Sequence, residues 1–98
     1  MTTTLEYLRT EKRDEILALA RQHGVKDVRV FGSVVREEDT DESDIDFLIR
    51  LNTGRNLDDW FDFWDNLEDL LGKEVDVLQE KSLHWYIKPQ ILAEAQPL

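Results

Sequence analysis

Two short stretches separated by ten residues decide the fold of this chain: Val28-Arg29-Val30-Phe31-Gly32-Ser33 and Asp44-Ile45-Asp46-Phe47-Leu48-Ile49. Both are rich in β-branched and aromatic residues, which favours two strands. Successive side chains of a strand point to opposite faces of the sheet, so Asp44 and Asp46 should share one face while Ile45 faces the core. The sequence therefore predicts a sheet with two carboxylates side by side on one face.

Helices and one further strand are expected around this pair of strands. An amphipathic helix should begin at Thr3 or Thr4 and run to His23, because Thr3 and Glu6 have the spacing of a capping box and Gly24 favours a helix end. The other elements expected, in chain order, are a strand over 25–31, a strand over 45–51, a helix between Asn56 and Gly72, a strand over 74–78, and a helix from Pro89 through Ala95. No repeat or linker interrupts them, so we expect a single domain over residues 1–98.

The composition of the 98-residue chain is acidic, with 22 Asp and Glu residues against 12 Lys and Arg residues and a formal net charge of −10. This charge repels a phosphate backbone, so direct nucleic-acid binding is not expected. It favours a basic protein partner, although an acidic surface is also an ordinary way to keep a small domain soluble. No apolar run approaches the length of about 20 residues that a membrane span needs. With no cysteine and no secretory leader, we expect a cytoplasmic location away from membranes.

A third strand supplies a third carboxylate. Alternation over 74–78 places Asp76 on the face opposite to the two valines. If this strand lies beside the second one, Asp44, Asp46 and Asp76 can together hold two Mg²⁺ ions, whose preferred ligands are hard oxygens. Two such ions stabilise the entering and leaving oxygens when a hydroxyl attacks the α-phosphate of a nucleoside triphosphate. These three aspartates are therefore the candidate catalytic and metal-binding residues.

The end of the first strand is a candidate phosphate site. Gly32 lets the backbone come close to a ligand, and Ser33 offers a hydroxyl and free amide groups to phosphate oxygens. A turn followed by a helix cap would place the same two residues there for structural reasons alone. Arg36 is equally compatible with a phosphate contact and with an ion pair to a carboxylate of the acidic loop over 37–42.

The three aspartates also have a structural alternative. Asp44 and Asp46 could be exposed positions at a sheet edge, although two adjacent like charges would cost stability without a metal to relieve them. Asp76 could instead pair with Lys73 or Arg50. The metal-site interpretation accounts for all three positions together.

Seven positions of this chain resemble the minimal nucleotidyltransferases of the polymerase-beta superfamily: Gly32, Ser33, Arg36, Ser43, Asp44, Asp46 and Asp76. The resemblance extends from about Val28 to Leu78 and includes the order of helices and strands. It implies an α/β (α+β) fold, the polymerase-beta-like nucleotidyltransferase fold, with a small mixed β-sheet flanked by helices. It also implies ATP as co-substrate, two Mg²⁺ ions, and nucleotide or phosphate binding at Gly32, Ser33, Arg36 and Ser43.

The resemblance extends to function. Small proteins similar to this chain are antitoxins encoded beside a HEPN-domain ribonuclease toxin, which they neutralise by binding it and transferring AMP to a tyrosine hydroxyl. The implied activity is that of a protein adenylyltransferase in a hetero-oligomer with the toxin, and Trp85 would suit a partner surface. Two alternatives stay open: an antitoxin that acts by binding and occlusion alone, and nucleotidyl transfer to a small molecule such as an aminoglycoside.

Overall fold

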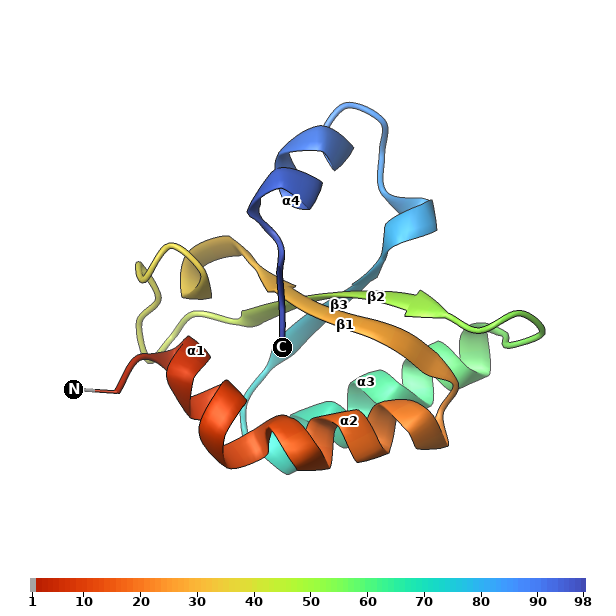
Figure 1. Cartoon of the computed structure of the whole chain (residues 1–98), viewed down its shortest axis with the longest axis horizontal. Coiled ribbons are helices and arrows are strands. Elements are labelled where there is room, and N and C mark those ends of the chain that lie inside the picture. The colour runs from red at the N-terminus through yellow and green to blue at the C-terminus, as the bar shows by residue number, and fades with distance from the viewer. Residues whose placement is uncertain (1) are drawn as a thin grey trace.

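A four-stranded mixed sheet organises residues 2–98, which the computed structural model describes (Figure 1). Its strands are β1 (Val25–Phe31), β2 (Ile45–Leu51), β3 (Val75–Gln79) and β4 (Gln96–Pro97), in the order β3-β2-β1-β4. Strand β1 is antiparallel to both β2 and β4, whereas β2 and β3 are parallel. The mixed sheet implied by the resemblance is confirmed.

Helices cover both faces of this sheet. They are α1 (Thr4–Tyr7), a π-helical turn (Leu8–Lys12), α2 (Arg13–Gln22), α3 (Leu57–Leu71) and α4 (Lys88–Glu94). Short 3₁₀ turns at Gly32–Val34 and Glu80–Ser82 follow β1 and β3. In Figure 1, α2 and α3 lie beneath the sheet, whereas α4 lies on its other side. One face of the sheet is thus packed against two helices, and the other is only partly covered.

The strand predictions agree closely with the structure. Strands β1 and β2 have the predicted bounds, and β3 begins and ends one residue later than predicted. Glycines at 24 and 32 flank β1, and both have positive φ angles (72° and 80°), which ends the extended backbone there. No pattern predicts β4, because its two residues are too few to show alternation.

The helix predictions agree at most ends. Helix α3 follows Asn56, whose side chain accepts hydrogen bonds from the amides of Asp58 and Asp59, and it ends at Gly72. Helix α4 has its proline in the first turn, as predicted, and ends at Glu94, one residue before the predicted end. These ends are set by local chemistry, which explains why the sequence predicts them.

The single N-terminal helix predicted to run to His23 contains a π-helical turn. The side chain of Thr3 caps its start by accepting from the amide of Glu6, as predicted. Leu8 and Ile16 are both fully buried and stand eight positions apart, a spacing that rotates two residues of a regular α-helix by about 80° relative to each other, within one broad apolar face. The π turn accommodates one extra residue and brings the two side chains into closer alignment toward the core.

The hydrophobic core lies between the sheet and the helices α2 and α3. Ile16 and Ala20 of α2 and Phe63 and Leu67 of α3 contribute to it. From the sheet it receives alternate strand residues, namely Val28, Val30, Ile45, Phe47, Ile49, Val75 and Val77. The intervening strand positions point to the other face, which therefore carries Asp46 and Asp76.

The free edge of β3 is covered by side chains of α3. The indole Nε1 of Trp60 donates to the carbonyl of Val77 at 2.9 Å, and the amide of Val75 donates to Glu68 Oε2 at 3.1 Å. An edge strand otherwise presents unpaired backbone groups that attract another strand. Trp60 and Glu68 thus satisfy two of these groups and fix the position of the strand that carries Asp76.

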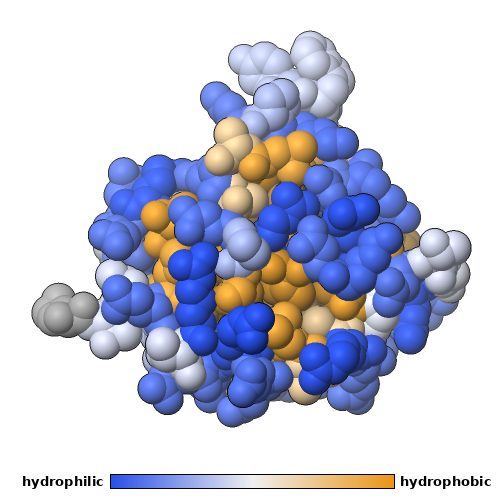
Figure 2. Space-filling view, in the orientation of Figure 1, coloured by the Kyte–Doolittle hydropathy of each residue, from blue (hydrophilic) through white to orange (hydrophobic). Residues whose placement is uncertain are grey.

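The surface carries a few large apolar side chains. In Figure 2, apolar surface gathers near the middle of the visible face, framed by hydrophilic residues. The large exposed apolar residues are Tyr7, Leu57, Phe61, Trp85, Tyr86 and Ile87. Three of these are consecutive and lie directly before α4. No helix among residues 2–98 has the length and apolar character needed to cross a membrane.

Candidate functional site

The partly covered face of the sheet brings the candidate aspartates to one end. Asp46 of β2 and Asp76 of β3 are register partners on parallel strands, and Asp44 stands directly before β2. Asp46 is half-buried, whereas Asp44 and Asp76 are exposed. On the opposite side, Asp46 is the register partner of Phe31, the residue before Gly32. We call this region, made of the three aspartates and Gly32, the aspartate end of the sheet.

Negative charge accumulates around Asp46. Its pKa is raised to about 6, first by burial, and then by the charges of Asp76 and Asp44 and a hydrogen bond with Asp76. The positive charge of Arg36 opposes these effects. Carboxylates this close repel one another when both are ionised, and a bound cation relieves that repulsion. The aspartate end is therefore a site that attracts cations.

Gly32 is required by the position of Asp46. Its φ angle is +80°, in the left-handed region that favours glycine. A Cβ added there would lie 2.2 Å from Asp46 Oδ2, so any other residue would push the carboxylate away. Sequence reasoning explains this glycine by close approach of a ligand, whereas the structure shows a close approach of a neighbouring carboxylate.

A carboxylate already occupies the groups expected to bind phosphate. The amide of Gly32 donates to Glu94 Oε2 at 3.2 Å, and the guanidinium of Arg36 pairs with Glu94 Oε1. Arg36 Nε also lies 3.2 Å from Glu38 Oε2, in the acidic loop. The hydrogen bonds to Glu38 and Glu94 raise the pKa of Arg36. The ion-pair alternative for Arg36 is thus observed, and its phosphate contact stays a prediction.

Ser33 and Ser43 hold the turns on either side of the acidic loop. The carbonyl of Ser33 accepts from the amide of Glu38 at 2.9 Å, after β1. Ser43 Oγ accepts from the amide of Thr40 at 2.9 Å, and its own amide donates to the Thr40 carbonyl at 3.0 Å. Both serines thus have a structural role, and their role in nucleotide binding stays a prediction.

The donor set at the aspartate end suits a hard divalent cation. All three candidate side chains offer carboxylate oxygens, which Mg²⁺ prefers. The register places two of them on neighbouring strands, and the charges of Asp76 and Asp44 add to burial in raising the pKa of Asp46. Across residues 2–98, however, no three Asp, Glu, His or Cys side chains are arranged as a ready metal site. At least one of the three side chains would have to rotate to complete a three-carboxylate site.

Glu94 is the residue of this site that sequence reasoning missed. It stands 62 positions after Gly32, on a seven-residue helix, and no motif connects the two. Strand β4 explains the contact, because it pairs Gln96 with Val30 and so returns the chain to the end of β1. A seven-residue helix followed by a two-residue strand carries no sequence signal for such a return.

Comparison with known proteins adds the family. Residues 14–98 match the family described as "Polymerase beta, Nucleotidyltransferase". A Methanocaldococcus jannaschii protein whose name assigns it, provisionally, to the protein adenylyltransferases is 42% identical over 87% of this chain and 91% of its own length. Protein adenylyltransferase MntA of Thermococcus cleftensis is 36% identical over 78% of this chain and 77% of its own length.

Solved structures share the fold. A chain described provisionally as a minimal nucleotidyltransferase superposes with a TM-score of 0.85 and 43% identity, over 100% of this chain and 97% of that one. A toxin–antitoxin structure with AMP-PNP gives a TM-score of 0.74 at 18% identity, over 88% of this chain and 71% of that one. A structure of a tri-AMPylated Shewanella oneidensis HEPN toxin in complex with MNT antitoxin gives a TM-score of 0.64 at 17% identity, over 86% of this chain and 66% of that one. The last two show a common fold only.

Proposed function

The chain belongs to the polymerase beta nucleotidyltransferase family, and we propose on that premise that it is an antitoxin that transfers AMP from ATP to a tyrosine hydroxyl of a HEPN-type ribonuclease toxin. Relatives named protein adenylyltransferases favour a protein acceptor over a small molecule. The fold shared with toxin–antitoxin complexes and the formal charge of −10 favour a basic protein partner. The cytoplasmic location and the single domain over residues 1–98 stay part of the proposal.

The cross-strand pair of Asp46 and Asp76 beside the Gly32 bend carries this proposal. Asp44, Asp46 and Asp76 would hold two Mg²⁺ ions, which when bound stabilise the charge that develops on the entering and leaving oxygens. Asp76 is exposed, so it can accept a hydrogen bond from an incoming tyrosine hydroxyl. Asp46, half-buried between the strands, holds its carboxylate in a fixed position against Gly32.

The transfer balances as a single displacement. The tyrosine oxygen forms a bond to the α-phosphorus of ATP, and the bond from that phosphorus to the bridging oxygen breaks, releasing pyrophosphate. The tyrosine proton leaves through the hydrogen bond to the Asp76 carboxylate and passes to water. No oxidation or reduction is involved. The products are an AMP-tyrosine ester and pyrophosphate.

Phosphate binding would replace the present contacts of Glu94. The amide of Gly32 and the guanidinium of Arg36 both hold the carboxylate of Glu94, which has the charge and the acceptor oxygens of a phosphate group. An ATP phosphate would take over these two donors, with Ser33 and Ser43 beside them. Helix α4 would then lose its contact with the end of β1.

Labelled AMP transfer tests the proposal. Purified protein with Mg²⁺, labelled ATP and the product of the neighbouring gene is expected to yield a labelled adduct on a tyrosine of that product. Asp44→Asn plus Asp46→Asn should lower the rate at least about 100-fold, since charge stabilisation at the transferred phosphoryl group is lost. The matched control is Asp62→Asn plus Asp65→Asn, which removes the same charge from exposed positions of α3. Absence of an adduct with the unaltered protein would exclude the transferase.

A second candidate function is neutralisation by binding alone, and the exposed aromatic segment before α4 favours it. Trp85 and Tyr86 are 77% and 73% exposed, and Ile87 is 39% exposed. Aromatic residues of this kind often carry much of the energy of a protein interface. If Asp44→Asn plus Asp46→Asn still neutralises the toxin while Trp85→Ala plus Tyr86→Ala does not, occlusion is the function and transfer is not.

A further inference from the structure

A cavity of about 300 Å³ opens at the other end of the sheet, lined by residues from both faces. It lies where β2 and β3 end, four residues along β2 from Asp46, which corresponds to about 13 Å of extended strand. Its lining includes Lys26, Arg50, Gln79, Glu80, Lys81 and Lys88. We call this region the lysine end of the sheet. It is separate from the aspartate end, because the fully buried Leu48 stands between Asp46 and Arg50 on the strand.

The arginines at the lysine end are already paired. Arg50 Nε lies 3.3 Å from Glu80 Oε2, and Arg29 Nη2 lies 3.2 Å from Glu80 Oε1. Arg29 Nε also lies 3.2 Å from Asp27 Oδ2. Two positive and two negative charges thus compensate one another around Glu80 and Arg29. Because of these ion pairs, neither Arg29 nor Arg50 is free to bind a further anion in a bidentate manner.

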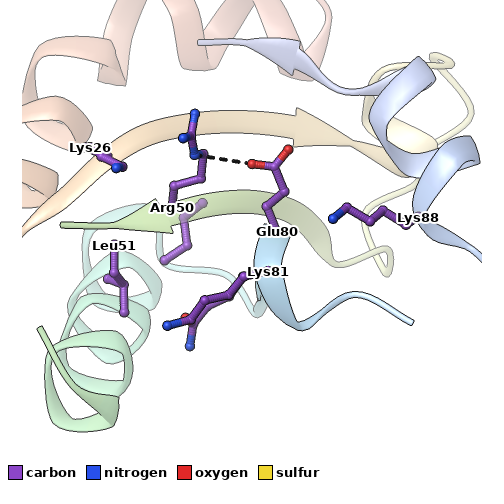
Figure 3. Close-up of a pocket in the computed structure, with 8 residues that line it drawn as sticks. Lys26, Arg50, Leu51, Glu80, Lys81 and Lys88 are labelled. Atoms are coloured by element: carbon purple, nitrogen blue, oxygen red, sulfur yellow. Dashed lines mark ion pairs between the residues drawn. The ribbon is translucent and has the colours of Figure 1, made fainter. Parts of the chain in front are cut away.

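Three lysines at the cavity have no such partner. Within residues 2–98, neither Lys26, Lys81 nor Lys88 has a carboxylate within ion-pair distance. Figure 3 shows Lys26 and Lys88 extending toward the Arg50–Glu80 ion pair from opposite sides. Uncompensated like charges around one cavity repel each other unless an anion binds between them. In a chain with a net charge of −10, this concentration of positive charge needs an explanation.

Gln79 adds an independent observation. Its side chain lines the cavity and is only 5% exposed, and its Oε1 is buried without a hydrogen-bond partner. A buried acceptor that is left unpaired costs free energy, and such atoms are rare in folded proteins. A ligand that carries a hydroxyl or amino donor beside its anionic group would satisfy the lysines and Gln79 together.

We propose that the lysine end is a second ligand site that binds the phosphate of a nucleoside monophosphate, either free or attached to a protein. Lysines bind phosphate as point charges, whereas a carboxylate is best bound by a free arginine fork, which this cavity lacks. A ribose hydroxyl supplies the donor that Gln79 needs. A long nucleic acid is disfavoured because the rest of the chain is strongly acidic. The site does not depend on the transferase activity proposed above.

Titration with AMP, followed by backbone amide NMR of the full chain in EDTA, tests this site. We expect shifts at Gln79, Glu80 and Lys81, and affinity that falls as NaCl is raised. The triple variant Lys26→Gln, Lys81→Gln, Lys88→Gln should bind at least tenfold more weakly. The matched control Lys12→Gln, Arg13→Gln, Arg21→Gln removes the same charge from the helix layer and should keep the affinity within about twofold.

The result can overturn the proposal in three ways. Unchanged affinity in the lysine variant, an equal loss in the control variant, or shifts confined to residues 32–36 would each exclude a phosphate site at the lysine end. Repeating the titration in Asp44→Asn plus Asp46→Asn keeps this test separate from the proposed transfer, since the lysine end should still bind AMP there. A peptide that carries an adenylylated tyrosine is the second probe, and it distinguishes the two forms of the ligand. Tighter binding of the peptide than of AMP indicates that the site binds a nucleotide attached to protein. Tighter binding of AMP indicates that it binds the free nucleotide.

Discussion

The aspartate end and the lysine end lie at opposite ends of the same two strands, yet their charges are arranged in opposite ways. At the aspartate end, like charges face each other across β2 and β3, and the pKa of Asp46 is raised to about 6. At the lysine end, Glu80 lies between Arg29 and Arg50, and its charge is compensated. Ionic groups that only stabilise a fold are normally paired. The unpaired aspartates and lysines therefore mark where ligands of opposite charge are expected.

The comparison also shows how one strand separates two sites. Residues two apart on β2 share a face, so Asp46, Leu48 and Arg50 stand in one row. Leu48 is fully buried in the middle of that row. Asp46 and Arg50 stand four residues apart, about 13 Å along the strand, so their interaction is weak because the Coulomb energy falls with distance. The cation and anion sites proposed at the two ends would therefore bind their ligands independently.

The largest expected effect concerns the contact between Gly32 and Asp46. Gly32→Ala should lower AMP transfer about 100-fold or more, because the added Cβ displaces the Asp46 carboxylate, and a misplacement of about 1 Å can cost that much. The control is Gly54→Ala, whose φ angle is +89° but whose surroundings are open. Both variants should lose about 1–2 kcal/mol of stability through the left-handed backbone, and only Gly32→Ala should lose activity. Equal activities would show that Asp46 needs no fixed position.

The next effect concerns the cost of burying the Asp46 carboxylate beside two other carboxylates. The pKa of Asp46 is about 6 in the folded protein, against an ordinary value of 3.8 for an aspartate side chain, so between about pH 4 and 6 the folded state keeps a proton that the unfolded state releases. Stability therefore falls as the pH rises through this window. In EDTA at pH 7, Asp46→Asn should be more stable by about 1–2 kcal/mol after allowance for solvent screening, and the gain should vanish below about pH 4.

Thermal unfolding at several pH values measures this difference. The control Asp65→Asn lies on the exposed side of α3 and should change stability by less than about 0.5 kcal/mol at every pH. A gain from Asp46→Asn that stays constant between pH 4 and 7 would rule out proton linkage as its cause. Added Mg²⁺ should reverse the gain, since the cation stabilises only the carboxylate form.

A smaller effect is expected at Glu94, whose carboxylate holds the donors proposed for phosphate. Glu94→Gln should tighten ATP binding about 3- to 10-fold, because Gly32 and Arg36 no longer have to release a charged partner. Glu38→Gln is the control, since Glu38 pairs with Arg36 but has no contact with Gly32. Calorimetric titration with ATP and Mg²⁺ compares them. Weaker binding in Glu94→Gln would mean that Glu94 supports the nucleotide site instead of competing with it.

Local patterns predict the strands and the aspartates, whereas long-range contacts complete both ends. The alternation in β2 and the glycines around β1 depend on neighbouring residues, and so does the cap at Asn56. The parallel pairing of β2 and β3 then places Asp76 beside Asp46, as the alternation suggests. The position of Glu94 is different, because it depends on a two-residue strand that no periodicity reveals.

The lysine end is likewise hidden in the sequence. Lys26 belongs to β1, Lys81 to the turn after β3 and Lys88 to α4, so they meet only through the folded arrangement. A net charge of −10 gives no reason to predict a positively charged site. The net charge of the chain therefore predicts that its protein partners are basic, but it does not predict the local charge of a single cavity. The ion pairs of the structure show which positive side chains at this cavity are unpaired, and the composition cannot show this.

The smallest expected effect distinguishes paired from unpaired charge at the lysine end. Glu80→Gln leaves Arg29 and Arg50 without their shared carboxylate, so the cavity becomes more positive and AMP should bind about 2- to 3-fold more tightly. Stability should fall by less than about 1 kcal/mol, because both pairs are partly exposed. NMR titration with AMP and thermal unfolding measure the two quantities. Weaker AMP binding would show that Glu80 keeps the cavity in shape by holding Arg29 and Arg50 in place. The difference in ligand preference between the two ends would then depend on the positions of the charged groups more than on their net charge.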